Sequence, residues 1–337
     1  MSEELVVVKQ EDLRKMTIRK LAEAGMSEGS AAVVADVLVY AELRGVSSHG
    51  VLRVEHYTNR IRSGGINLEP GLSVEYVRPA IGMLDAEGAM GHVATKFATG
   101  EAIRLAREHG MAMIGIKNSS HCGALAYYVQ EMLNERMASM VCVNTDKLVV
   151  PFGGRQSFFG SNPFAFGFPG AKDDILLDMA TSEIAWGKIL HARENKQALA
   201  PGCAVDAEGR PTTDPFKAVS LTAFGGPKGY GISVMVEALT GLMIGGVFGP
   251  HLKKMYGDLN TYRDLSSFML VIDPSVFGSA TDLFERTQCM IDELHDQPAA
   301  EGYEKVMVPG EIEKRCMARR QIEGIPVPKA IFEFLCQ

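Results

Sequence analysis

Several motifs that define well-known classes of site are missing from this chain of 337 residues. No GxGxxG and no GxxxxGK(S/T) occurs, and the nearest glycine run after a predicted strand, 87–91, matches neither. No HExxH occurs, and His49 and His56 lack the i, i+4 spacing of zinc ligands. The sequence therefore predicts neither a Rossmann dinucleotide domain nor a metal centre.

Cysteine pairs and clustered positive charge are missing as well. The net charge is −7 without a basic stripe, so nucleic acid and anionic membranes are excluded as partners, and an anionic substrate needs a local cationic pocket. The spacing of the cysteines, far apart and without Cys-x-x-Cys, predicts reduced thiols. The six are Cys122, Cys142, Cys203, Cys289, Cys316 and Cys336.

No stretch predicts a membrane span or an export signal. Only 229–249 approaches membrane length, but Glu237 lies in its middle and glycines interrupt it, which favours a buried helix. Residues 1–20 alternate charges with short apolar runs rather than forming the continuous apolar stretch of a signal peptide. We therefore expect a cytoplasmic protein.

The first seventy residues have helical periodicity. Leu13, Met16 and Leu21 share one face, Ser27 can cap a second helix that runs to Gly45, and a third helix continues to Gly64. Strands and helices then alternate. The predicted strands are 72–77, 80–84, 111–116, 138–143, 163–169, 175–178 and 267–272. The predicted helices are 91–109, 123–136, 182–193 and 281–294, with 327–335 as a last helix or strand.

Three polar residues of the third predicted helix fall on one face. His49, Arg53 and Tyr57 are spaced i, i+4 and i+8, and Ser48 stands beside them near the start of the helix, where an anion is favoured. Arg53 can clamp a carboxylate with two hydrogen bonds, and Tyr57 can add a hydroxyl donor. A solvated polar stripe would give the same pattern.

His121 is the candidate general base. It follows a predicted strand at a turn into a helix, and histidine titrates near neutral pH. Asp146, at the end of the next predicted strand, can orient the imidazole and stabilise its cation. A structural histidine and a turn or capping aspartate are the ordinary alternatives.

Two further turns are suited to phosphate groups. Asp178, Met179 and Ala180 lie where a strand gives way to a helix, whose free N–H groups can cradle an anion or simply be capped by the hydroxyls that follow. Lys228 stands in the glycine-rich turn 226–229 before the apolar helix. These residues favour an acid–base enzyme with an organic cofactor over a metalloenzyme.

Taken together, these motifs resemble the malate/L-lactate dehydrogenase family of nicotinamide-dependent 2-hydroxyacid oxidoreductases, which lack a Rossmann fold. The similarity extends over nearly the whole chain. It rests on the order of the segments 44–50, 150–154, 160–163, 178–181, 211–215, 226–231 and 309–311.

This resemblance implies an α+β fold with two lobes. A helical substrate lobe would comprise residues 1–72, completed by about 229–260 and 312–337. A NAD-binding lobe with a mixed, largely antiparallel sheet would comprise 73–228 and about 261–311. The resemblance also implies a homodimer whose active site lies between the lobes and borrows residues from the second chain.

The resemblance assigns roles to individual residues. It makes His121 the catalytic base, with His49 as second choice, and gives Ser48, Arg53 and Tyr57 to a small anionic 2-hydroxy acid. The cofactor is expected to be NAD, with NADP left open. Its implied contacts are Thr145, Asp178, Met179, Ala180, Lys228, Gly310 and Glu311.

Two readings from other classes stay open on the residues alone. A lyase or hydrolase that acts on ureido acids would also use a histidine and an arginine clamp, but it needs no nicotinamide. A ligand-binding protein without catalysis would tolerate the loss of His121.

Overall fold

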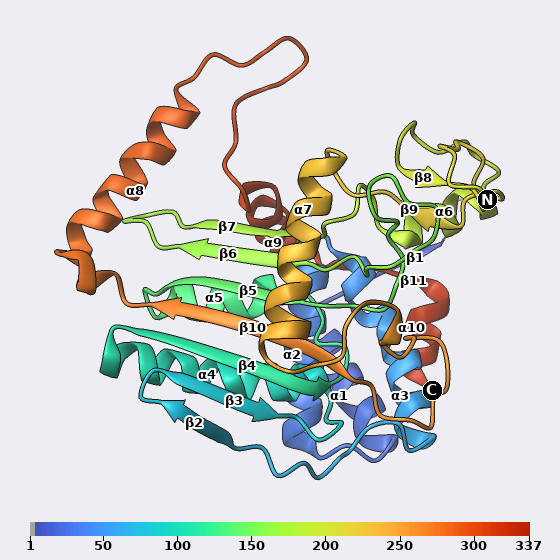
Figure 1. Ribbon diagram of the computed structural model, residues 1–337, viewed down its shortest axis with the longest axis horizontal. Helices are drawn as coiled ribbons and strands as arrows, with labels where there is room; N and C mark the ends of the chain where they lie inside the picture. The colour runs from blue at the N-terminus through green and yellow to red at the C-terminus, as the bar shows by residue number, and fades with distance from the viewer. Residues whose placement is uncertain (1–3) are drawn as a thin grey trace.

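A seven-stranded sheet forms the centre of the computed structural model, which describes residues 4–337 (Figure 1). Its strand order is β2-β3-β4-β10-β5-β6-β7, and only the β3–β4 pair is parallel. The strands are β2 Val74–Arg78, β3 Ile81–Asp85, β4 Met111–Ser119, β5 Ala138–Val143, β6 Phe164–Phe168, β7 Ile175–Met179 and β10 Leu265–Ile272. The α+β class with a mixed, largely antiparallel sheet is therefore confirmed.

Helices cover both faces of this sheet. Figure 1 shows α4 (Gly91–His109) and α5 (Ala126–Asn134) behind it and α7 (Pro227–Glu237) in front. Alanines at 94, 98, 102 and 106 of α4 are fully buried, so this helix packs closely on the large apolar side chains of the sheet. On the other face, Val236 of α7 packs against Cys142, Phe164 and Phe268.

The two ends of the chain meet in a second, helical region. Strand β1 (Leu5–Val8) pairs antiparallel with β11 (Ile325–Pro328), and α10 (Lys329–Cys336) follows. With α1 (Gln10–Glu23), α2 (Glu28–Leu43) and α3 (Val54–Arg62) they enclose an apolar core of their own. Ser27 caps α2 by accepting a hydrogen bond from the Ser30 backbone N–H. Residues 25–29 read Gly-x-Ser-x-Gly, but they connect two helices and do not follow a strand, so they are not the nucleophile elbow of a serine hydrolase.

The third predicted helix is interrupted at its start. Ser47–His49 and Val51–Arg53 form two short 3₁₀ turns before α3, so His49, Arg53 and Tyr57 do not share one helical face as expected. The buried carboxylate of Glu42 causes the break, because it accepts hydrogen bonds from the Ser47 hydroxyl (2.7 Å) and the Val51 backbone N–H (3.0 Å). A Cβ at Gly50 would lie 2.0 Å from that carboxylate.

Residues 229–260 also differ from the expectation. Helix α7 and its π-helical continuation, Ala238–Met243, pack on the sheet rather than with the helical region, because their apolar side chains cover its front face. The loop around Met255 does contact the helical region, where Arg60 donates a hydrogen bond to the Met255 carbonyl (2.9 Å). The other lobe boundaries stay a prediction.

The remaining elements surround the sheet. A small subdomain contains α6 (Trp186–Glu194) and the short pair β8 (Ala204–Val205) and β9 (Ser220–Leu221). Helix α8 (Ala280–His295) and a long loop extend past β7 and return at α9 (Glu311–Glu323), at the top of Figure 1. Within residues 4–337, no helix is long and apolar enough to cross a membrane.

Candidate active site

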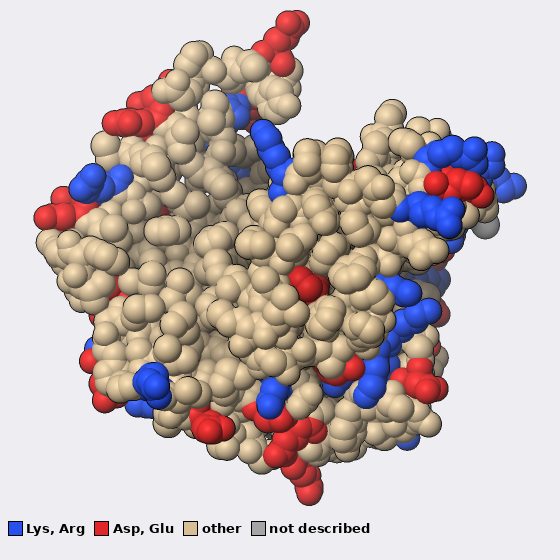
Figure 2. Space-filling model, viewed as in Figure 1, with Lys and Arg blue, Asp and Glu red and all other residues tan. Residues whose placement is uncertain are grey.

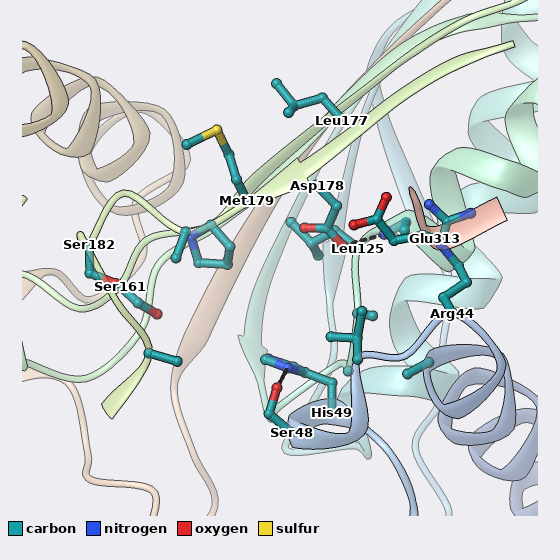
Figure 3. Close-up of a pocket in the computed structure, with 18 of the residues that line it drawn as sticks. Arg44, Ser48, His49, Leu125, Ser161, Leu177, Asp178, Met179, Ser182 and Glu313 are labelled. Carbon is teal, nitrogen blue, oxygen red and sulfur yellow. Dashed lines mark hydrogen bonds between the residues drawn. The ribbon is translucent and has the colours of Figure 1, made fainter. Parts of the chain in front are cut away.

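A cavity of about 1150 Å³ lies between the helical region, the sheet and the loop that precedes α9. It is lined by the C-terminal end of α2, by loops that follow β4 and β5, by the end of β7 and by residues 299–313. Ser48, His49, Arg53, His121, Asp146, Thr145, Asp178, Met179, Ala180 and Gly310 all line it. The cavity thus brings together most of the site residues predicted from the sequence, and Figure 3 shows part of its wall.

His121 lies in the loop that connects β4 to α5. Gly91 allows this loop to approach α4, because a Cβ at Gly91 would lie 2.1 Å from the Ser120 carbonyl oxygen. The Gly91 backbone N–H also donates to the Ser120 hydroxyl (2.9 Å). Gly123, at φ +78°, turns the chain toward α5 past the buried ring of His92.

The two ring nitrogens of His121 face different surroundings. Nδ1 lies 2.6 Å from the hydroxyl of Tyr57 and accepts a hydrogen bond from the Gly123 backbone N–H (3.3 Å). Nε2 makes no hydrogen bond to any residue from 4 to 337. This nitrogen remains accessible from the cavity. The imidazole therefore has one anchored nitrogen and one that is free to meet a ligand.

The position of Tyr57 departs from its predicted role. The residue is 3 % exposed and is not among those that line the cavity, so it lies behind His121 rather than at the cavity wall.

Asp146 does not orient His121. Its carboxylate pairs with the guanidinium of Arg263 and accepts a hydrogen bond from the Met255 backbone N–H (3.2 Å). The Arg263 side chain is only 2 % exposed, so this buried cation needs the Asp146 carboxylate as its counter-charge. The carboxylate is therefore committed to Arg263 and not to the His121 imidazole. The contact to Nδ1 that the sequence suggested for Asp146 is made by Tyr57 instead.

The histidines of the site are held neutral. Burial, and then the positive charge of Arg53, lowers the pKa of His49 to about 4. Burial lowers the pKa of His121 well below its usual value, and the neighbouring His49, Arg53, His92 and Arg263 act in the same direction. His49 stacks on His121 with ring centroids 5.6 Å apart, so two neutral imidazoles lie side by side in the cavity wall.

Arg53 is the predicted carboxylate clamp, and it is already oriented. Its Nε donates to the Ser48 carbonyl (2.8 Å), and one Nη donates to the hydroxyl of Tyr256, a residue that sequence reasoning gave no role. The Ser48 hydroxyl lies 3.0 Å from Nδ1 of His49. Ser48, His49 and Arg53 thus form one polar wall near His121.

Thr145 and Gly310 lie in the part of the cavity predicted to hold the cofactor. The Thr145 backbone N–H donates to the side chain of Asn162 (3.1 Å), which in turn donates to the buried carboxylate of Glu237 (2.6 Å). Gly310 has φ +89°, and a Cβ there would lie 2.5 Å from the Leu176 carbonyl oxygen. The buried Glu237 of the apolar helix therefore supports this wall of the cavity.

Some charged residues of the cavity were not predicted from the sequence, and two of them lie near Asp178. Arg44 and Glu313 point toward Asp178 in Figure 3; Arg44 begins the segment 44–50 that carries the family resemblance, but neither residue was given a role. Asp178 accepts a hydrogen bond from the Ala126 backbone N–H (2.8 Å), yet desolvation by the surrounding protein raises its pKa to about 6. Its carboxylate remains open to the cavity.

Two predicted cofactor residues do not line the cavity of this chain. Lys228 is exposed on the first turn of α7. Glu311 binds Lys305, His295 and Arg315 instead, and their hydrogen bonds outweigh its desolvation and lower its pKa to about 2. No group of three or more potential metal ligands occurs in the described part of the chain.

Comparison with known proteins defines the class of this fold and site. The chain matches the family described as malate/L-lactate dehydrogenase over residues 8–336. It is 39 % identical over 329 residues to the NAD(+) ureidoglycolate dehydrogenase of Escherichia coli strain K12, which covers 97 % of this chain and 94 % of that enzyme.

Solved structures agree with this match. The sulfolactate dehydrogenase of Methanocaldococcus jannaschii superposes with a TM-score of 0.92 at 34 % identity, covering 98 % of this chain and 95 % of that one. The malate dehydrogenase of Pyrococcus horikoshii OT3 gives 0.89 at 30 % identity, covering 99 % and 95 %. The protein is an oxidoreductase of the hydroxyacid dehydrogenase class. It belongs to the malate/L-lactate dehydrogenase family.

Replacing Arg53 with lysine tests the carboxylate clamp. We expect kcat/KM to fall by about 10- to 150-fold, equivalent to about 1.5–3 kcal/mol, because an ammonium group replaces a planar two-pronged donor. Steady-state kinetics measure kcat/KM for the acid, and NADH titration measures cofactor affinity, which should stay unchanged. Weakened NADH binding with unchanged substrate affinity would contradict the assignment.

Replacing Asp146 with asparagine separates its structural role from a catalytic one. We expect the free energy of unfolding to fall by about 1–3 kcal/mol, because Arg263 loses its buried counter-charge. Urea denaturation measures this loss. Unchanged stability together with a hundredfold drop in kcat would return Asp146 to the role of orienting His121.

Proposed function

We propose that this chain oxidises (S)-ureidoglycolate to oxalurate with NAD, a step of allantoin breakdown. The observation that carries the proposal is the opening of His121 into the same cavity as the Arg53 guanidinium. The similarity to a ureidoglycolate dehydrogenase over 97 % of the chain supports the choice of substrate. Relatives named for sulfolactate and malate make another 2-hydroxy or 2-oxo acid the alternative.

The chemistry follows from these positions. Arg53, with Ser48 beside it, would hold the carboxylate and so fix which face of the carbinol carbon is presented. Nε2 of His121 would take the hydroxyl proton while the C–H bond breaks. The nicotinamide, when bound, supplies the acceptor for the hydride.

Thr145, Asp178, Met179, Ala180 and Gly310 would hold the cofactor, since all of them line the cavity. The volume of about 1150 Å³ exceeds what a small hydroxy acid alone requires. NAD is preferred over NADP because the E. coli relative is named for NAD(+).

A panel of 2-hydroxy acids assayed with NAD and NADP tests the proposal. Ureidoglycolate, malate, sulfolactate and lactate are each supplied with both cofactors, and reduced cofactor is followed by absorbance. Turnover of ureidoglycolate with NAD is the expected result. Turnover of malate or sulfolactate alone would favour the alternative, and binding of ureidoglycolate without any reduced cofactor would favour a lyase, a hydrolase or a binding protein.

We also propose a cytoplasmic homodimer that associates through the front face of the sheet. Figure 2 shows a broad, largely uncharged surface over α7, where Met235, Leu242 and Met243 are each about 60 % exposed. Association there would bury these side chains and bring the exposed Lys228 close to the second chain. Multi-angle light scattering tests it: a Met235→Glu variant should become monomeric, and a wild-type monomer would contradict the proposal.

A further inference from the structure

From the segment that carries Ser48, His49 and Arg53 we infer that Glu42 is a positioning residue for the substrate acid. Its buried carboxylate sets the backbone of residues 47–53 and thereby the direction of the Arg53 guanidinium. This role rests on the proposed function only in that Arg53 holds a carboxylate. It does not require ureidoglycolate as the substrate.

Residues 47–53 present two faces. One face lines the large cavity, and the other lies against Glu42. The members of the first face are Ser48, His49, Leu52 and Arg53. The members of the second are Ser47, Gly50 and Val51, which do not line the cavity. Glu42 does not line it either, so its carboxylate acts on a bound acid through this segment.

The Glu42 carboxylate supplies the acceptors that a regular helix would otherwise provide here. It accepts hydrogen bonds from the Ser47 hydroxyl (2.7 Å) and from the backbone N–H of the buried Val51 (3.0 Å). Without this acceptor the Val51 N–H would be buried and unpaired, which costs more than an ordinary hydrogen bond contributes. Both 3₁₀ turns, 47–49 and 51–53, are therefore held against one side chain.

Glu42 is itself fixed from two sides. Gly50 allows its close approach, because a Cβ there would lie 2.0 Å from Oε1 of Glu42. From α9, Arg320 donates a hydrogen bond to the Glu42 backbone carbonyl and lies 3.8 Å from the carboxylate. This cation is the counter-charge that a buried carboxylate requires. The carboxylate thus has a defined position from which it holds the turns.

The turn 47–49 determines where Arg53 points. The Ser48 carbonyl accepts the Nε–H of Arg53 (2.8 Å), so the Nη groups remain as the donors for a carboxylate. His49, in the same turn, stacks on His121. A displaced turn would therefore move the guanidinium and the His49 ring together, whereas His121 lies in its own loop between β4 and α5.

The consequence is a separation of KM from kcat. Acid binding depends on Arg53 and hence on Glu42. Proton transfer depends on His121, whose loop is held by the hydrogen bond between the Gly91 N–H and the Ser120 hydroxyl. Loss of the Glu42 carboxylate should therefore weaken the binding of the acid and leave turnover at saturating acid and the affinity for NADH nearly unchanged.

Glu42→Leu is the main test, because it removes both acceptor oxygens at nearly the same side-chain volume. We expect KM for the acid to rise about 10- to 100-fold, kcat to fall less than about fivefold and the dissociation constant of NADH to change less than about twofold. Glu42→Gln should keep KM within about threefold of the wild-type value, because its amide can accept from the Val51 N–H and donate to the Ser47 oxygen.

Glu237→Leu is the matched control. Glu237 is also buried and also accepts two hydrogen bonds, from the Asn162 side chain (2.6 Å) and the Gly249 backbone N–H (2.7 Å), but it supports the cofactor side of the cavity. We expect this variant to weaken NADH binding more than acid binding. An equal loss of affinity for NADH and acid in Glu42→Leu would show a general loosening of the protein and overturn the positioning role.

Ser47→Ala keeps the test decisive if Glu42→Leu does not fold. It removes one of the two contacts of the Glu42 carboxylate, and Ser47 does not line the cavity, so a change in acid binding has to pass through the turn. We expect KM for the acid to rise about 3- to 10-fold. An unchanged KM would overturn the role of Glu42.

Calorimetry distinguishes this role from the proposed substrate. Ureidoglycolate and malate are titrated separately into wild-type and Glu42→Leu protein saturated with NADH, in which neither acid can be oxidised. Binding of malate alone by the wild type would contradict ureidoglycolate as the substrate, while a loss of malate affinity of at least about tenfold in Glu42→Leu would still support the positioning role. A wild-type protein that binds neither acid has no carboxylate site at Arg53, which would overturn both.

Discussion

Replacing His121 with alanine is expected to lower kcat by about 10²–10⁴ and to leave NADH affinity nearly unchanged. The imidazole is the group whose free nitrogen opens into the cavity beside Arg53, so its loss removes the acceptor for the substrate proton. The pocket itself should survive, because the Gly91 backbone N–H holds the loop through the Ser120 hydroxyl, a contact that does not involve the His121 ring. Stopped-flow kinetics and NADH fluorescence measure the two quantities.

His49→Ala is the comparison that makes this result decisive. His49 stacks on His121 and is also neutral, but its Nδ1 is engaged by the Ser48 hydroxyl. We expect its kcat to stay well above that of His121→Ala. Near-normal turnover without His121, together with a collapse without His49, would exchange the two roles.

Elements with strong local patterns could be predicted from the sequence. The bounds 91–109 and 138–143 agree with α4 and β5, because an alanine stripe at helical spacing favours a helix and a short apolar run with valines at its end favours a buried strand. Helix α9 was not predicted, since its polar sequence has no apolar face and none of its side chains is buried. Nor was β1, which forms only because it pairs with β11 at the other end of the chain.

The residues of the candidate site show the same difference between local patterns and tertiary contacts. His121 and Arg53 could be found because their chemistry is visible in their own side chains, and both line one cavity. The interaction partners of the site residues could not be predicted from the sequence. Asp146 pairs with Arg263, 117 residues away in the sequence, and the 3₁₀ turns that hold His49 and Arg53 ahead of α3 arise from the buried Glu42. Both results depend on tertiary contacts that no local spacing encodes.

Family membership does not fix the substrate. We expect kcat/KM to differ strongly between ureidoglycolate and a simpler hydroxy acid such as lactate. Ureidoglycolate carries a ureido group with several N–H donors and a carbonyl, so a site made for it needs polar partners beyond the carboxylate clamp. Ser48, His49 and the Tyr256 hydroxyl are polar groups close to Arg53 that line the same cavity. When lactate binds instead, each partner that is left without a hydrogen bond costs about 1–3 kcal/mol.

Two or three such losses, at about 2 kcal/mol each, predict that kcat/KM for ureidoglycolate exceeds that for lactate by at least about 10³, since each 1.4 kcal/mol is a factor of ten. Initial rates of NADH formation with the two acids at matched, subsaturating concentrations give this ratio directly. Tyr256→Phe is a further check: it removes one polar partner, so it should reduce the ratio by lowering the rate with ureidoglycolate more than the rate with lactate. Parity, or a preference for lactate or malate, would exclude ureidoglycolate as the substrate and leave the oxidoreductase class intact, because that class depends on the fold and the cavity and not on the side group of the acid.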